Sequence, residues 1–368
     1  MARRARVALI IMGLTAATLV VAGRPSRRPA AAATADHTPL LRILRQHGIP
    51  ETSQLLVFSK TSLQRARISR TNPRAIYFND RAAVGWVPGS PVVEVATFDG
   101  AQSGVAFYTA DVSEGSARVL KRGGQCFECH ALPDGGGLLG LVLRSAGVRP
   151  AEHRCFEDID DDTPWAWRWG GWFVTGARVP SGHAGQTQLP AFDRPYPQPG
   201  SDVVALLVLG HQVGVTNLIA RLDREVRLAD LDADAGRAPD TAAMEARVDA
   251  LADAMLFLDE APLPAPVAGR SAFVRAFEAQ GVHDPHGHSL RTLDLQRRLL
   301  RVPCSFMIHS PIFQALPATA RQAVYSRISE RLASRDARVS AKLSDEDRAA
   351  IVHILHATVP DLPARFGA

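Results

Sequence analysis

A run of five residues, Cys126-Phe127-Glu128-Cys129-His130, constrains this chain more than any other feature. In a helical turn, positions i, i+3 and i+4 share one face, so both sulfurs and the imidazole point in the same direction. This C-x-x-C-H spacing is the pattern for covalent attachment of haem. The thiols bond to the two vinyl groups of the porphyrin, and the histidine binds the iron. We therefore expect one covalently attached haem c on Cys126 and Cys129, with His130 as the proximal iron ligand.

Residues 1–35 have the pattern of an export signal or an N-terminal anchor. Three arginines within the first six residues precede an apolar run over residues 7–23, and Ala33-Thr34-Ala35 offers small residues at a cleavage position. The apolar run is slightly short for a membrane span of about 20 residues. A cleaved signal is the first expectation, and an anchor at residues 7–23 is the alternative. Either way, we expect the rest of the chain to be periplasmic or otherwise exported, and membrane-bound only if this segment is retained.

Three other uses of the cysteine pair compete with haem. A structural zinc site needs four nitrogen or sulfur ligands, and no second C-x-x-C or paired-histidine motif accompanies this one. A thioredoxin-like dithiol is expected in a βαβ context, which the glycine-rich surroundings do not indicate. A simple disulfide between Cys126 and Cys129 stays open. The export pattern favours haem, because c-type haem is attached outside the bacterial cytoplasm.

The charge of the chain argues against nucleic acid as a partner. The formal net charge is +5, but residues 1–35 hold six arginines and no acidic residue, so the remainder carries −1. A nearly neutral domain has no electrostatic reason to bind a polyphosphate. The partners that we expect are periplasmic redox proteins.

Residues 36–115 are predicted to be rich in β-structure, and residues 116–368 to form a helical haem-binding region with long loops. Apolar runs bounded by turn residues indicate strands at 55–58, 75–78, 83–87, 92–98 and 105–108. Helical periodicity indicates helices at 202–224, 241–258, 318–333 and 345–358, and a short helix or turn is expected at 116–125. The predicted fold is mainly α, with a small N-terminal antiparallel β unit and a cytochrome c-like haem-binding helical core.

Four of the five tryptophans lie within eight residues, at Trp165, Trp167, Trp169 and Trp172. Such a density of large planar side chains suits a wall for a flat macrocycle, with Trp169 and Trp172 as the candidates, and the two glycines between them permit close backbone approach. Ordinary core packing or a carbohydrate-stacking surface explains the cluster equally well.

The sixth iron ligand decides the function. A histidine or methionine there gives an electron carrier, whereas an empty position permits chemistry with peroxide, oxygen or nitric oxide. His211 is the first candidate, because an imidazole within the apolar run 203–212 must find a partner. His183, in a loop after the tryptophan cluster, is the second. Met307 and Met255 are further candidates, with core packing as their alternative role.

Other histidines and cysteines are secondary. His283, His286 and His288 have the spacing of a metal cluster, but the turn-rich segment around them is interpreted as a solvated loop. Cys155 and Cys304 remain after haem attachment, and a disulfide between them is an open alternative.

Several segments resemble a family of uncharacterised bacterial proteins known only as cytochrome c domain proteins. Besides the C-x-x-C-H motif, these are residues 75–80, 84–89, 168–176, 201–206, 211–212 and 303–306. The resemblance implies haem binding and export and no particular substrate. It also implies histidines at the positions of His183 and His211, and it does not clearly imply a cysteine at Cys155. Residues 347–355 resemble the C-terminal helix of cytochrome c folds, which packs across the haem-attachment helix.

Two functions follow as expectations. The first is a periplasmic mono-haem c-type cytochrome that transfers single electrons between redox partners, with His211 or His183 as the distal ligand. The alternative is a peroxidase-like haem enzyme with an open distal iron site. The usual di-haem bacterial peroxidases carry two C-x-x-C-H motifs, and this chain has one. A haem-based sensor is a third class, for which no output domain is evident.

Overall fold

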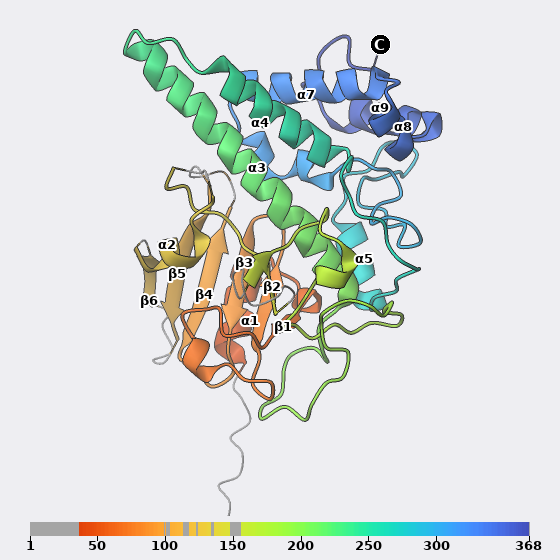
Figure 1. Ribbon diagram of the computed structural model, residues 1–368. Coiled ribbons are helices and arrows are strands. Elements are labelled where there is room, and N and C mark those ends of the chain that lie inside the picture. Colours follow the sequence, from red (N-terminus) through yellow and green to blue (C-terminus); the bar gives the residue numbers. More distant parts are fainter. Residues whose placement is uncertain are drawn as a thin grey trace, which may run out of the picture. The chain divides into compact units, whose positions relative to one another are not determined.

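Six strands that follow one another in the chain form a single antiparallel sheet (Figure 1). Each strand pairs with the next one along the chain. Their bounds are β1 (Leu55–Val57), β2 (Arg74–Phe78), β3 (Ala82–Trp86), β4 (Val92–Thr97), β5 (Ala106–Asp111) and β6 (Arg118–Arg122). The five strands predicted between residues 55 and 108 are confirmed.

The computed structural model describes residues 37–367, apart from residue 99 and the stretches 101–103, 113–117, 123, 134–135 and 148–155. Within it, Ala35–Ala368 form one compact unit. The predicted export signal or anchor at residues 1–35 lies outside the described residues, and so does Cys155.

Both faces of the sheet are buried, as the alternation of side chains along β2 illustrates. Tyr77 packs on one face with the buried residues of α1 (Thr38–Gln46), while Ile76 packs on the other face with the main core. Neighbouring residues of a strand point to opposite faces, so an apolar strand such as this one supplies both cores. Full burial of each large apolar side chain contributes about 1.5–3 kcal/mol.

The sheet is larger than the small β unit that the sequence predicts. β6 occupies part of the stretch 116–125, where a helix or turn is expected, and it pairs with β5 through Ala110 opposite Val119. The open edge of β5 offers unpaired backbone groups, and pairing with them outweighs the weak local preference of this stretch. The fold is therefore a mixture of helices and an antiparallel sheet rather than mainly α.

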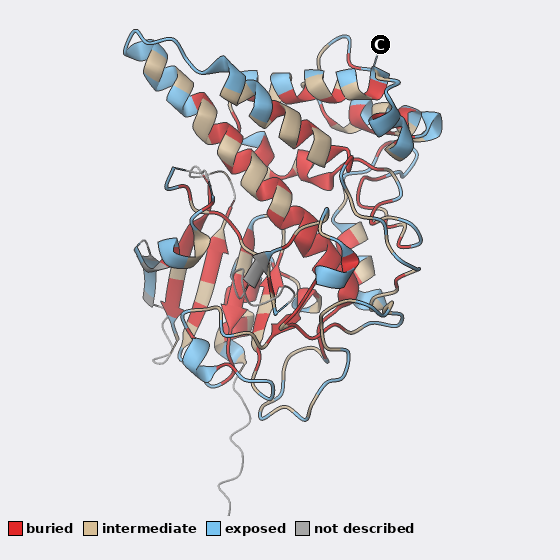
Figure 2. Ribbon diagram, in the orientation of Figure 1, coloured by how far each residue is buried: buried red, intermediate tan, exposed pale blue. Residues whose placement is uncertain are grey.

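α3 (Val203–Asp234) is the central helix and lies against both the sheet and the other helices (Figure 1). Asp202 caps its N-terminus by accepting hydrogen bonds from the backbone of Val204 and Ala205. The half near this cap is buried and the far end is exposed, as Figure 2 shows. By length and composition α3 could cross a membrane, but 83% of its most apolar window is buried inside the protein, as expected of a core helix.

A helical layer completes the structure on the side of α3 away from the sheet. α4 (Thr241–Met255) packs along α3, and α7 (Ala318–Ala333) packs along α4. The predicted helices at 241–258, 318–333 and 345–358 are confirmed in α4, in α7 and in α9 (Asp345–Thr358). The remaining elements are α5 (Ser271–Ala279), α6 (Pro311–Gln314), α8 (Ala337–Lys342), the 3-10 turns η1 (Glu51–Ser53), η2 (Arg65–Arg67), η3 (Trp165–Trp167) and η4 (Phe306–His309), and the pair β7 (Arg144–Ala146) and β8 (Phe156–Asp158).

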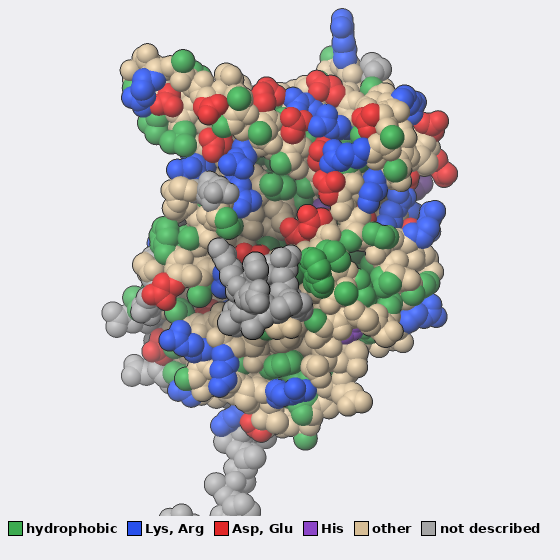
Figure 3. Space-filling model, viewed as in Figure 1, with side chains coloured by type: hydrophobic (Ala, Val, Ile, Leu, Met, Phe, Trp, Pro, Cys, Tyr) green, Lys and Arg blue, Asp and Glu red, His purple; other side chains and the backbone are tan. Residues whose placement is uncertain are grey.

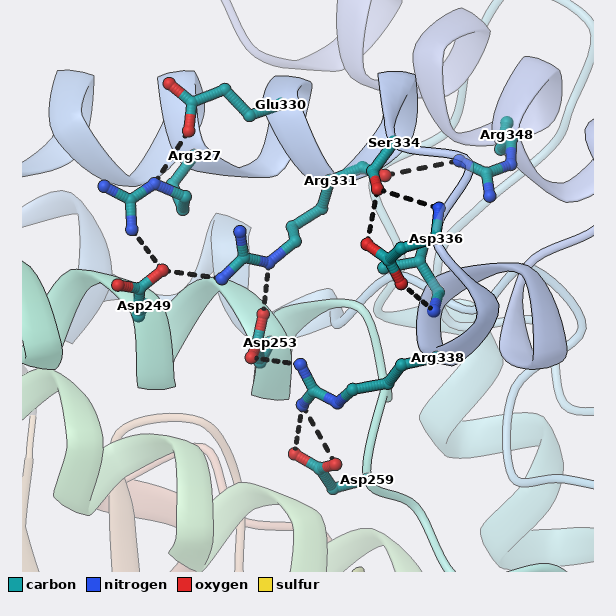
Figure 4. Close-up of polar contacts among 11 residues, drawn as sticks. Asp249, Asp253, Asp259, Arg327, Glu330, Arg331, Ser334, Asp336, Arg338 and Arg348 are labelled. Carbon is teal, nitrogen blue, oxygen red and sulfur yellow. Dashed lines mark hydrogen bonds and ion pairs between the residues drawn. The ribbon is translucent and has the colours of Figure 1, made fainter.

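Arginines and aspartates connect α4 to α7 and α8 (Figure 4). Arg331 donates to Asp253 at 2.8 Å and to Asp249 at 2.6 Å. Arg338 of α8 donates to the other oxygen of Asp253 at 2.8 Å and also binds Asp259. Acidic and basic side chains accordingly intermix over the helical part of the surface in Figure 3.

The last helix does not pack across the motif-bearing helix α2 (Gly124–His130). α2 lies beside β5 and β6, whereas α9 lies at the far end of the helical layer, near α8 (Figure 1). The expected contact is therefore wrong, because the apolar face of α9, with Ile351, Ile354 and Leu355, is buried among its own helical neighbours.

Candidate functional site

α2 carries the C-x-x-C-H motif and presents it to one pocket. Cys126, Cys129 and His130 all line this pocket, so they share one side of the helix, as their spacing predicts. The rest of the pocket comes from the sheet, from residues 61–63 and 141–143, from Trp172 and from α3. Segments far apart in the chain thus converge on the three motif side chains.

The side chains that the sheet presents to the pocket are mostly short. Ala83 of β3 pairs with Ala96 of β4, and Gly85 pairs with Glu94. A Cβ at Gly85 would collide with the guanidinium of Arg74, so a larger residue there would displace that side chain from its position across the strand. A flat, largely apolar wall results, and it suits a flat ligand.

One backbone hydrogen bond orients the ring of His130. Its Nδ1 donates to the carbonyl oxygen of Gly140 at 3.0 Å, which leaves Nε2 as the nitrogen with a free lone pair. Burial lowers the pKa of His130 to about 4, against the hydrogen bond to Gly140, and nearby Arg74 and Arg144 lower it further. The imidazole is therefore neutral, which is the form that ligates a metal. Its ring lies against the ring of Phe107, with centroids 4.2 Å apart.

An ion pair lies in the sheet wall of the same pocket. Arg74 of β2 binds Glu94 of β4, and both side chains are mostly buried. Arg74 Nε and Glu94 Oε1 are buried without a hydrogen-bond partner among the described residues. Such atoms are costly unless a ligand or water satisfies them. Neither residue is predicted as a site residue from the sequence; the available signal is a charged side chain inside an otherwise apolar strand.

The tryptophan cluster divides between two roles. Trp172 lines the pocket, and its Nε1 donates to the carbonyl oxygen of Arg144 at 2.7 Å. Trp169 instead packs edge-on against Trp165, with centroids 4.8 Å apart, outside the pocket lining. Gly170, which follows Trp169, does permit close approach of two backbone segments, because a Cβ on Gly170 would collide with the backbone of β7. Trp172 therefore lies in the lining of the motif pocket, and Trp169 belongs to the core beside it.

His211 does not face the pocket. Leu209 and Val213 of α3 line it, and a residue two positions away from each lies about 200° round the helix. The fully buried His211 instead contacts Asp161 through Nδ1 and Ser305 through Nε2, both at 2.6 Å. Both ring nitrogens are occupied, so the described structure does not place His211 as a distal iron ligand.

The contacts of His211 follow the order of a Ser-His-Asp triad without the access that a triad needs. The side chain of Ser305 is fully buried and is absent from the linings of the described pockets, so no substrate carbonyl can approach it. Burial alone would raise the pKa of Asp161, but the charge and hydrogen bond of His211 lower it overall, with help from Arg168. The cluster is a buried polar link between α3 and two loops.

The other distal candidates also lie elsewhere. His183 contacts Trp165 and Trp169, and its Nδ1 accepts a hydrogen bond from the backbone of Gly185 at 3.0 Å. Met255 and Met307 are fully buried in the main core. Among the described residues that line the pocket, His130 is the only histidine, and no methionine is present.

The histidines of the loop 283–288 are exposed, as the sequence predicts, but the aspartate beside them is not. Asp284, His288 and His353 bring their ligand atoms within 4.8 Å of one another, and the Asp284 side chain is fully buried. The interpretation of residues 283–288 as a solvated loop is therefore wrong for Asp284. His353 lies on α9, 65 residues after His288, so the local spacing of histidines does not predict that it joins the group.

Comparison with known proteins gives no relative for this chain. No family model matches it, and no curated protein or solved structure matches it. The resemblance to cytochrome c domain proteins stays a prediction, and the function rests on the geometry above.

Cys304 is the cysteine outside the motif that lies within the described residues, and it is fully buried. Burial raises the pKa of Cys304 to about 12, so this free thiol is protonated and unreactive at neutral pH. The disulfide alternative involves Cys155, which lies outside the described residues.

Proposed function

We propose that this chain is an exported c-type haem protein with one haem on Cys126 and Cys129, and that it acts as a peroxidase-type oxidoreductase. The observation that carries the proposal is the orientation of the motif. α2 presents both thiols and His130 to a single pocket, and the bond from His130 Nδ1 to Gly140 leaves Nε2 for the iron.

The residues around the motif fit a haem. The sheet wall of the pocket has the small residues Ala83, Gly85 and Ala96 beside the Arg74–Glu94 pair, and Trp172 also lines the pocket. The unpartnered atoms of Arg74 and Glu94 are consistent with a bound group that supplies hydrogen bonds. Because the sheet forms this wall, we propose a sheet-based haem site in place of the cytochrome c-like helical core.

The pocket lining favours the enzyme over the electron carrier. Histidine or methionine on the distal side is typical of carriers, and His130 is the only such residue among the described lining residues. When bound, the haem would supply the redox chemistry of its iron. The Glu94 carboxylate lines the pocket and could accept a proton from a peroxide and return it, and Arg74 could stabilise developing negative charge.

The absorption spectrum tests this proposal in protein from a host with c-type haem maturation. We expect covalent haem, a high-spin ferric spectrum, and no spectral change in His211→Ala. Haem that acid acetone extracts would overturn covalent attachment. A low-spin ferric spectrum would overturn the open distal site and favour the carrier, which passes electrons between periplasmic redox partners.

Turnover with peroxide tests the role of Glu94. We expect Glu94→Gln to lower kcat/KM by at least about 100-fold, because acid–base groups typically contribute about 10²–10⁴-fold. Glu128→Gln is the matched control, since Glu128 lies within the motif but is exposed and does not line the pocket. Equal activity in both variants would remove Glu94 from the mechanism.

A further inference from the structure

A second group of ligand-type side chains lies away from the haem pocket, where the loop 283–288 meets α9. Its members are Asp284, His288 and His353. The Nδ1 of His288 lies 2.9 Å from Asp284 Oδ2, and the Nε2 of His353 lies 3.2 Å from the same oxygen. One carboxylate oxygen and two imidazole nitrogens therefore converge on one point from two elements.

Backbone hydrogen bonds within the loop orient the carboxylate of Asp284. Asp284 Oδ1 accepts hydrogen bonds from the backbone N–H groups of His286 and His288, both at 2.8 Å, which aims Oδ2 at the imidazoles. Gly287 adopts a φ of 86°, which lets the chain turn back so that His288 lies over Asp284. This arrangement resembles the supporting hydrogen bonds that orient the ligands of metal sites.

We infer that Asp284, His288 and His353 bind a divalent transition-metal ion, with zinc as the first candidate. Zinc accepts nitrogen and carboxylate oxygen ligands at about 2.0–2.2 Å, so adjacent ligand atoms in a tetrahedral site lie about 3.4 Å apart. The separations of 2.9 and 3.2 Å from the carboxylate oxygen, with all three ligand atoms within 4.8 Å of one another, need only a small adjustment to admit the ion. The buried carboxylate supplies one negative charge, and the two half-exposed imidazoles leave a route for the ion to enter.

Three protein ligands leave one position of a tetrahedral ion open. The ring of His286 stacks on that of His353, with centroids 5.6 Å apart, and is not among the converging ligand atoms. His286 and His353 also line a surface hollow together with Arg335 and Arg348. The fourth ligand is therefore water or a small anion from this hollow, as in zinc sites that keep one open position.

Calorimetric titration with zinc tests the site in the full chain, purified without a histidine tag and with any haem that it carries. We expect one zinc ion per chain with a micromolar or lower dissociation constant, and one retained zinc by elemental analysis after dialysis. Loss of a supporting partner alone weakens metal sites by about 10–100-fold. His353→Ala and Asp284→Asn should therefore weaken binding by at least about 100-fold.

The controls separate ligation from folding and from surface histidines in general. His283→Ala removes an exposed histidine of the same loop and should leave the affinity unchanged. Asp284→Asn keeps an oxygen for the two backbone N–H groups, so its urea midpoint without zinc should stay close to that of the parent. Absence of zinc binding below about 100 μM, or full affinity in His353→Ala, would overturn the site. Neither result bears on the haem spectrum, so the two proposals fail independently.

Discussion

At the scale of single residues, burial and neighbouring charge decide which side chains carry charge. Glu260 follows α4 and accepts a hydrogen bond from the backbone of Leu299 at 3.0 Å. Burial raises the pKa of Glu260 to about 7, against that hydrogen bond, and the carboxylate of Asp161 contributes to the rise. The ordinary value is 4.5, so the folded protein keeps a proton on Glu260 that the unfolded chain releases at mildly acidic pH.

The stability of the protein should therefore fall as pH rises from about 4.5 to 7 through this residue. The unfolded state binds fewer protons in that window, so the contribution of Glu260 is complete below pH 4.5 and is lost above pH 7. Urea denaturation at pH 5 and at pH 8 measures how far the unfolding free energy falls between these two pH values. In Glu260→Gln this fall should be smaller than in the parent by about 2–3 kcal/mol. Glu346→Gln, at an exposed position, is the control; an identical pH dependence in both variants would contradict the assignment.

At the scale of elements, packing partners decide more than local preference does. Alternating or continuous apolar runs identified β1 to β5, and capping and periodicity identified α4, α7 and α9. β6 was missed because its pairing with β5 is a tertiary interaction. The placement of α9 beside the loop 283–288, rather than across α2, likewise depends on which apolar faces meet.

Asp253 of α4 pairs with arginines of α7 and α8, and substitution of Asp253 tests the contribution of these pairs to stability. The side chain is 13% exposed and accepts from Arg331 and Arg338 at 2.8 Å each. Asp253→Asn should lower the unfolding free energy by about 1–2 kcal/mol, since a partly buried pair is worth more than an exposed one. Arg335→Gln breaks a pair whose side chains are 67% and 85% exposed, and it should cost less than about 0.5 kcal/mol in the same urea experiment. Equal effects would contradict the network.

At the scale of the whole molecule, the pocket beside the C-x-x-C-H motif, which we propose to hold haem, joins the sheet to α3. Its lining takes Arg74 and Glu94 from the sheet and Leu209 and Val213 from α3, so a group bound there stabilises their arrangement. A ligand that binds only the folded state adds about 2.7 kcal/mol at 100 times its dissociation constant.

The double variant Cys126→Ala, Cys129→Ala should therefore lower the unfolding free energy by at least about 2 kcal/mol relative to the haem-loaded parent. Thermal unfolding followed by circular dichroism measures the loss. The same double variant should equal the parent when both are produced without haem maturation, which separates haem loss from the cysteine changes. If the double variant were less stable than the parent by the same amount when both lack haem, that result would contradict a stabilising role of the haem.

The sequence by itself determined the chemistry that depends on neighbouring positions. Cys126, Cys129 and His130 share one side of α2 because three- and four-residue spacings meet on any helix. Only the tertiary structure decided the far side of the pocket, where Arg74 and Glu94 lie in place of His211 or His183, and the pairing of His353 with Asp284. The residues that meet in each group are separated by tens of positions, and no local periodicity links them. Their meeting depends on how the sheet, α3 and α9 bury their apolar faces.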